Sequence, residues 1–205
     1  MVQELKEKLR ASGWMAIYKR LACVPDFLFW KVRGAPGPQV PHLIKERAVK
    51  RLGSEFGLKV LIETGTQFGQ MVSATRDHFR EIYSIELDPR RHEAARRHFA
   101  RDAHIHFLQG DSAVMLPRLL QSISEPCLFW LDAHSQSSPL TAELSTIFRH
   151  PVRSHVILID DAHGFDGQVW SPTLAEIRQH VAEASPGASV EVRGNMIQIC
   201  QARSG

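Results

Sequence analysis

The sequence predicts an α/β protein built on a doubly wound, seven-stranded and mostly parallel sheet with helices on both faces. Two observations predict this fold class. Five short apolar runs alternate with segments of helical character, which is the pattern of parallel strands joined by helices. Two strand-like runs joined by Gly194-Asn195 then close the chain, and this dipeptide is typical of a hairpin turn, so the last element should be antiparallel.

Length and composition place the chain among ordinary globular proteins. Its 205 residues are enough for one domain with a real core and a small appendage. The formal charge of +3 is too small to indicate a nucleic-acid partner, and a solvated helix face explains the basic stretch 90–101. The three cysteines lie far apart without metal-ligand spacing, which favours a reducing compartment and predicts a cytoplasmic protein.

The N-terminal part of the chain differs from the rest. Residues 1–45 are expected to form a helical extension, a lid or arm, ahead of the main domain at 46–205. Residues 2–32 look helical and weakly amphipathic, and the stretch 33–41 has the Gly and Pro content of a linker. No stretch reaches the roughly 20 apolar residues of a membrane span. A peripheral contact with a membrane surface or a homodimer contact stays open for this arm.

The elements follow in order after the linker. Pro41 should begin a helix with Ile44, Ala48 and Leu52 on one stripe, and Gly53 should end it. Parallel strands are expected at 58–63, 81–86, 105–109, 127–132 and 155–160, and the hairpin strands at 189–193 and 196–200. The intervening helices should begin near Asp88-Pro89, Asp111, Pro139 and Ser171-Pro172, because aspartate caps and proline opens a helix.

Acidic side chains stand at the carboxyl ends of all five parallel strands. They are Glu63, Glu86, Asp111 just past the third strand, Asp132, and the pair Asp160-Asp161. In an open α/β sheet, ligands bind beyond these strand ends. A single aspartate after a strand often only caps the next helix. Acids at all five ends together indicate a binding site.

A glycine turn follows the first strand in the stretch LIETGTQFG (61–69). Its glycines have neither the spacing of a dinucleotide fingerprint nor the Gly-Lys-Ser/Thr of a P-loop. The carboxylate of Glu63 would repel phosphate at this turn and suits a cationic ligand, although a helix-capping or turn-stabilising role stays open. Glu86 suits a sugar diol, because a carboxylate accepts two hydroxyl hydrogen bonds.

These motifs together resemble the class I S-adenosylmethionine-dependent methyltransferases over about residues 55–200. The resemblance rests on E-x-G-x-x-x-G at 63–69, the acid that ends the second strand, and GDS at 110–112. It implies a Rossmann-like methyltransferase fold with S-adenosylmethionine as cofactor, its methionine part near Glu63 and its ribose on Glu86. The implied cofactor-binding residues are Glu63, Gly65, Thr66, Gly69, Glu86, Asp111, Ser112 and Asp132.

A second group of acids follows strands four and five, in FWLDAH (129–134) and ILIDDAH (157–163). Neighbouring strands bring Asp132, Asp160 and Asp161 close together, and three crowded carboxylates resist full ionisation. A hard divalent cation relieves that repulsion, and oxygen ligands select Mg²⁺ or Ca²⁺. The arrangement resembles the metal site of catechol-type and natural-product-sugar O-methyltransferases, which implies Mg²⁺ or a similar cation.

The resemblance implies a metal-assisted O-methyltransferase acting on a hydroxyl of a small molecule or sugar. His134 is the candidate general base, with His163 in reserve, although related enzymes place an acid or a lysine near this position. Two other functions stay open. One is a metal-independent methyltransferase acting on nitrogen or oxygen, and the other is a non-catalytic binding protein that kept the fold.

Overall fold

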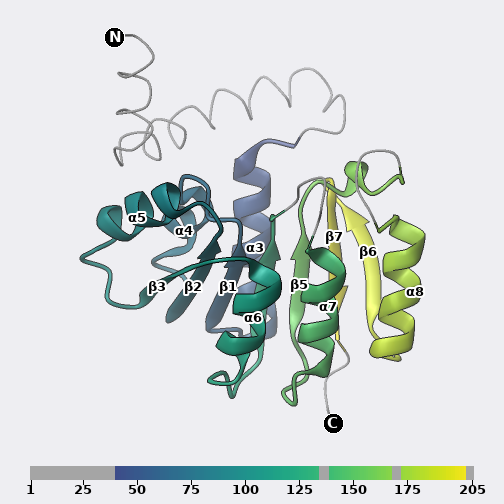
Figure 1. Ribbon diagram of the computed structural model, residues 1–205. Coiled ribbons are helices and arrows are strands. Elements are labelled where there is room, and N and C mark those ends of the chain that lie inside the picture. Colours follow the sequence, from purple (N-terminus) through teal and green to yellow (C-terminus); the bar gives the residue numbers. More distant parts are fainter. Residues whose placement is uncertain (1–39, 134–138, 168–171, 202–205) are drawn as a thin grey trace.

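A single sheet of seven strands organises the molecule. The computed structural model describes residues 40–133, 139–167 and 172–201, and its strand order is β3-β2-β1-β4-β5-β7-β6 (Figure 1). The strands are β1 (Val60–Thr64), β2 (Glu81–Glu86), β3 (Ile105–Gln109), β4 (Cys127–Leu131), β5 (Val156–Ile159), β6 (Ser189–Arg193) and β7 (Met196–Cys200). The first five run parallel, and β7 pairs antiparallel with β5 and β6. This confirms the predicted fold class.

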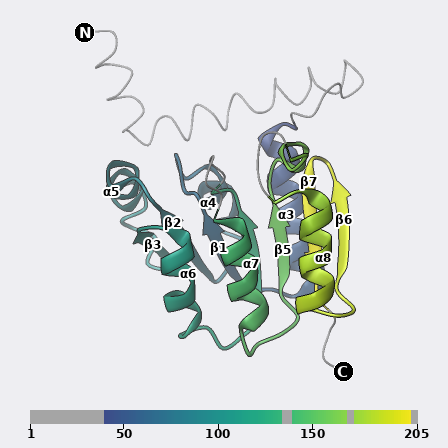
Figure 2. The ribbon, with the colours of Figure 1, turned by 45° about the vertical axis from the view of Figure 1, so that its right-hand side comes forward.

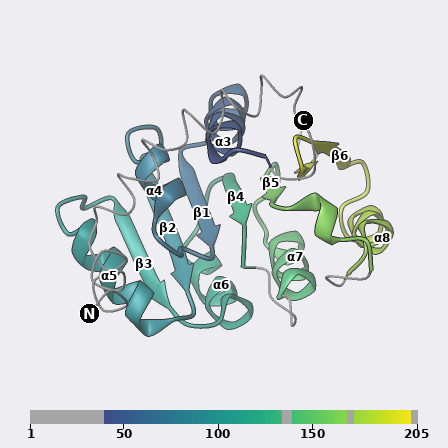
Figure 3. The same cartoon turned by 90° about the horizontal axis from the view of Figure 1, so that it is seen from above.

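Helices cover both faces of the sheet. They are α3 (His42–Phe56), α4 (Gln70–Thr75), α5 (Pro89–His98), α6 (Ser112–Leu120), α7 (Leu140–Arg149) and α8 (Leu174–Ala184), with a short 3-10 helix η1 (Ala162–Gly164). Figures 2 and 3 show α3 and α4 on one face and α6, α7 and α8 on the other. Among the described residues, no helix combines the length and apolar character needed to cross a membrane.

Alternate strand residues pack into two separate cores. In β4, Phe129 packs with residues of α6, α7 and α8, whereas Trp130 packs with residues of α3 and α4. The same alternation holds along β1 and β5. Successive side chains of a strand point to opposite faces, and both faces are buried here, so each strand is a continuous apolar run in the sequence. This alternation also sets which face the acids at the strand ends reach.

Helix α3 is longer than predicted and belongs to the sheet domain. The sequence predicts that it ends at Gly53, but it continues to Phe56 and ends at Gly57, which adopts the left-handed conformation (φ 69°). A Cβ atom on Gly53 would lie 2.8 Å from the Phe79 ring, so this glycine permits close packing instead of ending the helix. The predicted domain boundary between residues 45 and 46 falls inside α3. Residues 1–39, most of the predicted arm, lie outside the described residues.

Candidate functional site

A pocket of about 800 Å³ opens at the carboxyl edge of the parallel strands. It lies at the switch point of the sheet, beside β1. The strand order proceeds from β1 through β2 to β3 in one direction and from β1 through β4 to β5 in the other. Its volume falls in the range of small-molecule sites, roughly 300–1,000 Å³. The pocket brings together five of the predicted cofactor-binding residues, Gly65, Glu86, Asp111, Ser112 and Asp132.

The glycine turn after β1 passes close to the end of β4. Gly65 has a φ of 88°, and a Cβ atom there would lie 2.6 Å from the carbonyl oxygen of Asp132, so a side chain does not fit. Gly69, also in the left-handed conformation, precedes α4 and packs against the Phe99 ring. The first glycine therefore shapes the pocket wall, whereas the second serves the helix start and the core.

Glu86 ends β2 as a fixed carboxylate at the pocket wall. Its Oε2 accepts the amide of Gln67 at 2.8 Å, and its Oε1 accepts the amide of Asp88 at 2.9 Å. The side chain is almost fully buried, yet each oxygen keeps a lone pair for a further hydrogen bond. The next residue, Leu87, lines the same pocket and is 68% exposed, so an apolar surface adjoins the carboxylate. Sequence reasoning missed Leu87.

Glu63 is buried beneath the glycine turn, among hydroxyl groups. Burial raises its pKa to about 8, the charge of Glu86 adds to this, and the hydrogen bond from Ser84 opposes it. The Ser84 hydroxyl donates to Oε2 of Glu63 at 2.5 Å and lies 2.5 Å from the hydroxyl of Thr66. At neutral pH this carboxyl group therefore keeps its proton. A positive charge nearby would favour its ionised form.

The third strand leads into a capped helix at the pocket. The carboxylate of Asp111 accepts the amide of Ala113 at 2.9 Å, so Asp111 is the N-cap of α6. Asp88 caps α5 in the same way through the amides of Arg90 and Arg91. Asp111 and the buried Ser112 also line the pocket. Capping explains why this aspartate follows the strand and leaves its position at the pocket intact.

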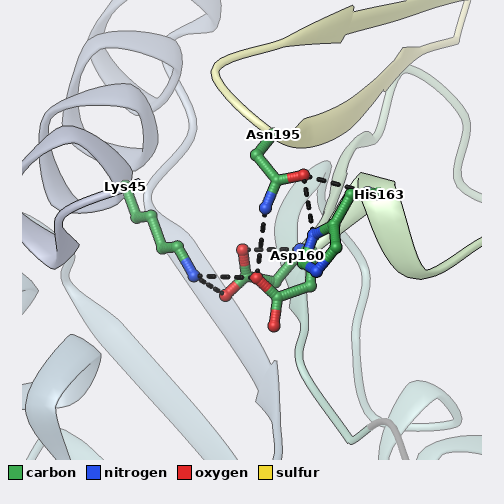
Figure 4. A network of polar contacts seen from close by, with 5 residues as sticks. Lys45, Asp160, His163 and Asn195 are labelled. Carbon is green, nitrogen blue, oxygen red and sulfur yellow. Dashed lines mark hydrogen bonds and ion pairs between the residues drawn. The ribbon is translucent and has the colours of Figure 1, made fainter. Parts of the chain in front are cut away.

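The acids after β4 and β5 meet a lysine that sequence reasoning did not assign. By the strand alternation, Asp160 continues β5 toward the face that α3 covers. The Nζ atom of Lys45 on α3 lies 2.5 Å from Oδ2 of Asp160 and 3.3 Å from Oδ1 of Asp161 (Figure 4). Burial raises the pKa of Asp160, and the lysine charge opposes the rise. Burial also raises the pKa of Asp132 well above its usual range, and the Asp160 charge adds to it.

The turn between β6 and β7 completes this polar network. The amide group of Asn195 donates to Oδ1 of Asp161 at 3.3 Å. Its Oδ1 accepts the backbone amide of His163 at 2.9 Å and lies 3.1 Å from Nδ1 of His163 (Figure 4). Because that oxygen is an acceptor, Nδ1 of His163 is the donor of this contact. Sequence reasoning placed Asn195 only in a hairpin turn, and the pairing of β7 with β5 brings it here.

The arrangement does not fit the metal site predicted from the sequence. Oδ2 of Asp160 binds the lysine ammonium, its Oδ1 accepts the amide of Asp161 at 2.7 Å, and Oδ1 of Asp161 binds both Lys45 and Asn195. Within the part of the chain that the structure describes, no group of three or more acidic, histidine or cysteine side chains is placed to hold a metal ion. His134, the candidate base, lies outside the described residues, and His163 is exposed beside the network.

Several solved structures of other proteins are similar to this one. The O-methyltransferase from Bacillus cereus in complex with SAH matches with a TM-score of 0.61 at 16% identity, over 88% of this chain and 91% of that chain. The O-methyltransferase TomG from Streptomyces achromogenes in complex with SAM matches with a TM-score of 0.62 at 12% identity, over 89% and 90%. The N-methyltransferase NodS from Bradyrhizobium japonicum matches with a TM-score of 0.53 at 13% identity, over 78% of this chain and 86% of that chain. No protein-family model and no curated protein matches. These likenesses confirm the Rossmann-like methyltransferase fold.

Proposed function

We propose that this protein transfers a methyl group from S-adenosylmethionine to a hydroxyl oxygen of a small-molecule or sugar acceptor. The observation that carries the proposal is the pocket at the switch point of the sheet, with the Glu86 carboxylate fixed at its wall and the glycine turn beside it. The similarity to O-methyltransferases solved with SAM or SAH supports it.

The pocket residues suit the parts of this cofactor. The Glu86 oxygens can accept the two ribose hydroxyls, because two backbone amides already hold the carboxylate in place. The exposed Leu87 offers an apolar surface for the adenine, next to Asp111 and Ser112. The carboxyl groups of the partly buried Asp132 at the pocket and of the buried Glu63 beneath the glycine turn favour a ligand with an ammonium and a sulfonium group. The cofactor, when bound, supplies an activated methyl group.

The acceptor hydroxyl must lose a proton as it attacks. A base within hydrogen-bond reach contributes about 10²–10⁴-fold, and we propose His134 for this role with His163 in reserve. His163 is exposed beside the polar network, and its Nδ1 faces the Asn195 oxygen. The proposed reaction has no metal step, since two of the three carboxylates predicted to bind Mg²⁺, those of Asp160 and Asp161, are bound to Lys45 instead.

Binding of S-adenosylhomocysteine, measured by calorimetry, tests the cofactor site. Glu86→Ala should weaken binding by roughly 1.5–3 kcal/mol, the scale of hydrogen bonds to a charged group. Glu81→Ala is the matched control, because Glu81 begins the same strand at the opposite edge of the sheet. Its affinity should equal that of the wild type.

Two results would contradict the proposal. If the wild type binds neither S-adenosylmethionine nor S-adenosylhomocysteine, the methyltransferase function fails at its base. If Glu86→Ala binds as tightly as the wild type, the assignment of Glu86 to the ribose is wrong. With binding established, transfer of a labelled methyl group to a panel of hydroxyl and amine acceptors identifies the acceptor class.

A further inference from the structure

The ion pair between Lys45 and Asp160, the residue that follows β5, is buried. The side chain of Lys45 is 13% exposed and that of Asp160 is 3% exposed. Removing two charges from water costs several kcal/mol each, and their attraction offsets this only with good geometry, so such a pair contributes little net stability compared with an apolar pair. The pair is therefore poorly explained as a stabilising contact alone.

The lysine is held by a rigid element. Val49 and Leu52 on the same helix are fully buried against the sheet, so α3 has a fixed position over β4 and β5. The ammonium group consequently reaches the carboxyl edge of the sheet at one defined place, between Asp160 and Asp161 (Figure 4). Asp132, which lines the pocket, follows β4, the strand that pairs with β5.

We propose that Lys45 is a built-in cation that takes the place of the divalent ion between the ends of β4 and β5. Its single charge balances the acids that a metal would otherwise bind, and it positions the acceptor oxygen beside the pocket. An ammonium group has three donors, and within the described residues two of them are bonded, to Asp160 and Asp161. The third donor is the one that an acceptor oxygen takes. This inference rests on the proposed methyl transfer and explains how it proceeds without metal.

Binding of Mn²⁺ to the full chain, followed by electron paramagnetic resonance, tests the replacement without turnover. The wild type should leave the spectrum of free Mn²⁺ unchanged. Lys45→Met removes the charge and keeps the length of the side chain, so it should gain at least about tenfold in Mn²⁺ affinity because the carboxylates become available. Lys45→Arg keeps a cation and should behave as the wild type. Lys50→Met on the same helix is the matched control and should gain nothing.

Mn²⁺ bound by the wild type as tightly as by Lys45→Met overturns the proposal, and so does a Lys45→Met protein that gains no affinity. If the unpaired Asp160 prevents Lys45→Met from folding, the measurement on the wild type still tests the proposal. Mn²⁺ that binds to the wild type but not to Asp161→Asn would show a metal site at these carboxylates and would contradict a built-in cation. The metal measurement needs neither cofactor nor acceptor, so its result is independent of the calorimetric test of the proposed function.

Kinetic measurements on Lys45→Met distinguish a role in positioning the acceptor from a purely structural role of Lys45. Once an acceptor is known, Lys45→Met should raise the acceptor KM and lower kcat/KM about tenfold or more, while its affinity for S-adenosylhomocysteine stays within about twofold of the wild type. A chelator should leave wild-type turnover unchanged. Wild-type activity that disappears in chelator and returns with Mg²⁺ overturns the proposal.

Discussion

Two glutamate side chains at neighbouring strand ends of this protein lie in different surroundings. Glu86 lies at the pocket with two amides on its oxygens, whereas Glu63 lies beneath the turn with hydroxyl neighbours. Burial raises the pKa of Glu63 to about 8, so it is neutral in the folded protein at pH 7 and ionised in the unfolded chain. The proton on Glu63 is therefore a consequence of its burial beneath the turn.

This difference predicts how Glu63→Gln affects stability. A folded-state pKa above the unfolded value means that stability is lost as pH rises from about 4.5 to about 8. Glutamine cannot ionise, so the variant should gain stability relative to the wild type by up to about 1.4 kcal/mol per pH unit across this window, and no more above it. Urea unfolding at pH 5 and pH 9 measures the change. A stability difference that is equal at both pH values would contradict the assignment. Glu81→Gln, at the half-buried start of β2, is the control.

Among the elements, α3 shows how packing overrides a local signal. Glycine commonly ends a helix, and Gly57 does so here, but Gly53 lies inside the helix against Phe79. The sequence contains both glycines four residues apart, and nothing local distinguishes them. The caps at Asp88 and Asp111 were predicted correctly, because a capping bond depends only on residues one turn away.

The packing of α3 predicts the effect of Gly53→Ala. Alanine should favour the helix by about 1 kcal/mol, but a methyl group placed 2.8 Å from the buried Phe79 ring should cost about 1–3 kcal/mol. The net result should be a loss of stability of about 1 kcal/mol, measured by chemical unfolding. The double variant Gly53→Ala with Phe79→Leu should show a favourable coupling energy. A higher melting temperature in Gly53→Ala alone would show that the ring moves aside.

The two edges of the sheet respond to pH in opposite ways across the whole molecule. The carboxyl edge holds acids with raised pKa values, including the partly buried Asp132 and the buried Glu63. The amino edge holds a buried histidine pair. The Cys127 amide donates to Nδ1 of His155 at 3.0 Å, Nε2 of His155 lies 3.1 Å from Nδ1 of His150, and Nε2 of His150 lies 3.0 Å from the Leu120 carbonyl oxygen. These three hydrogen bonds can form together only when both imidazole rings are neutral.

The histidine pair predicts a loss of stability in acid. Burial lowers the pKa of His155 to about 4, and a proton on Nδ1 would break the bond from Cys127. The unfolded chain takes up this proton near pH 6.5, so stability should fall by about 3 kcal/mol between pH 6.5 and pH 4. His155→Gln should be less stable at pH 7 and should lose this part of the slope. An unchanged slope, measured by urea unfolding at several pH values, would contradict the prediction.

Much of the fold and part of the site followed from local pattern in the sequence. The strands lie within two residues of their predicted bounds, because a buried strand is a short apolar run between breaking residues. The acids at the strand ends were visible for the same reason. The Lys45 network was not, since Lys45 and Asp160 are 115 residues apart. Tertiary packing decides which helix covers the face that Asp160 reaches, and therefore which charge that helix brings. Tertiary packing also decides the protonation of Glu63 and the role of Gly53. The sequence does not show these features, because long-range contacts and burial leave no periodic pattern in it.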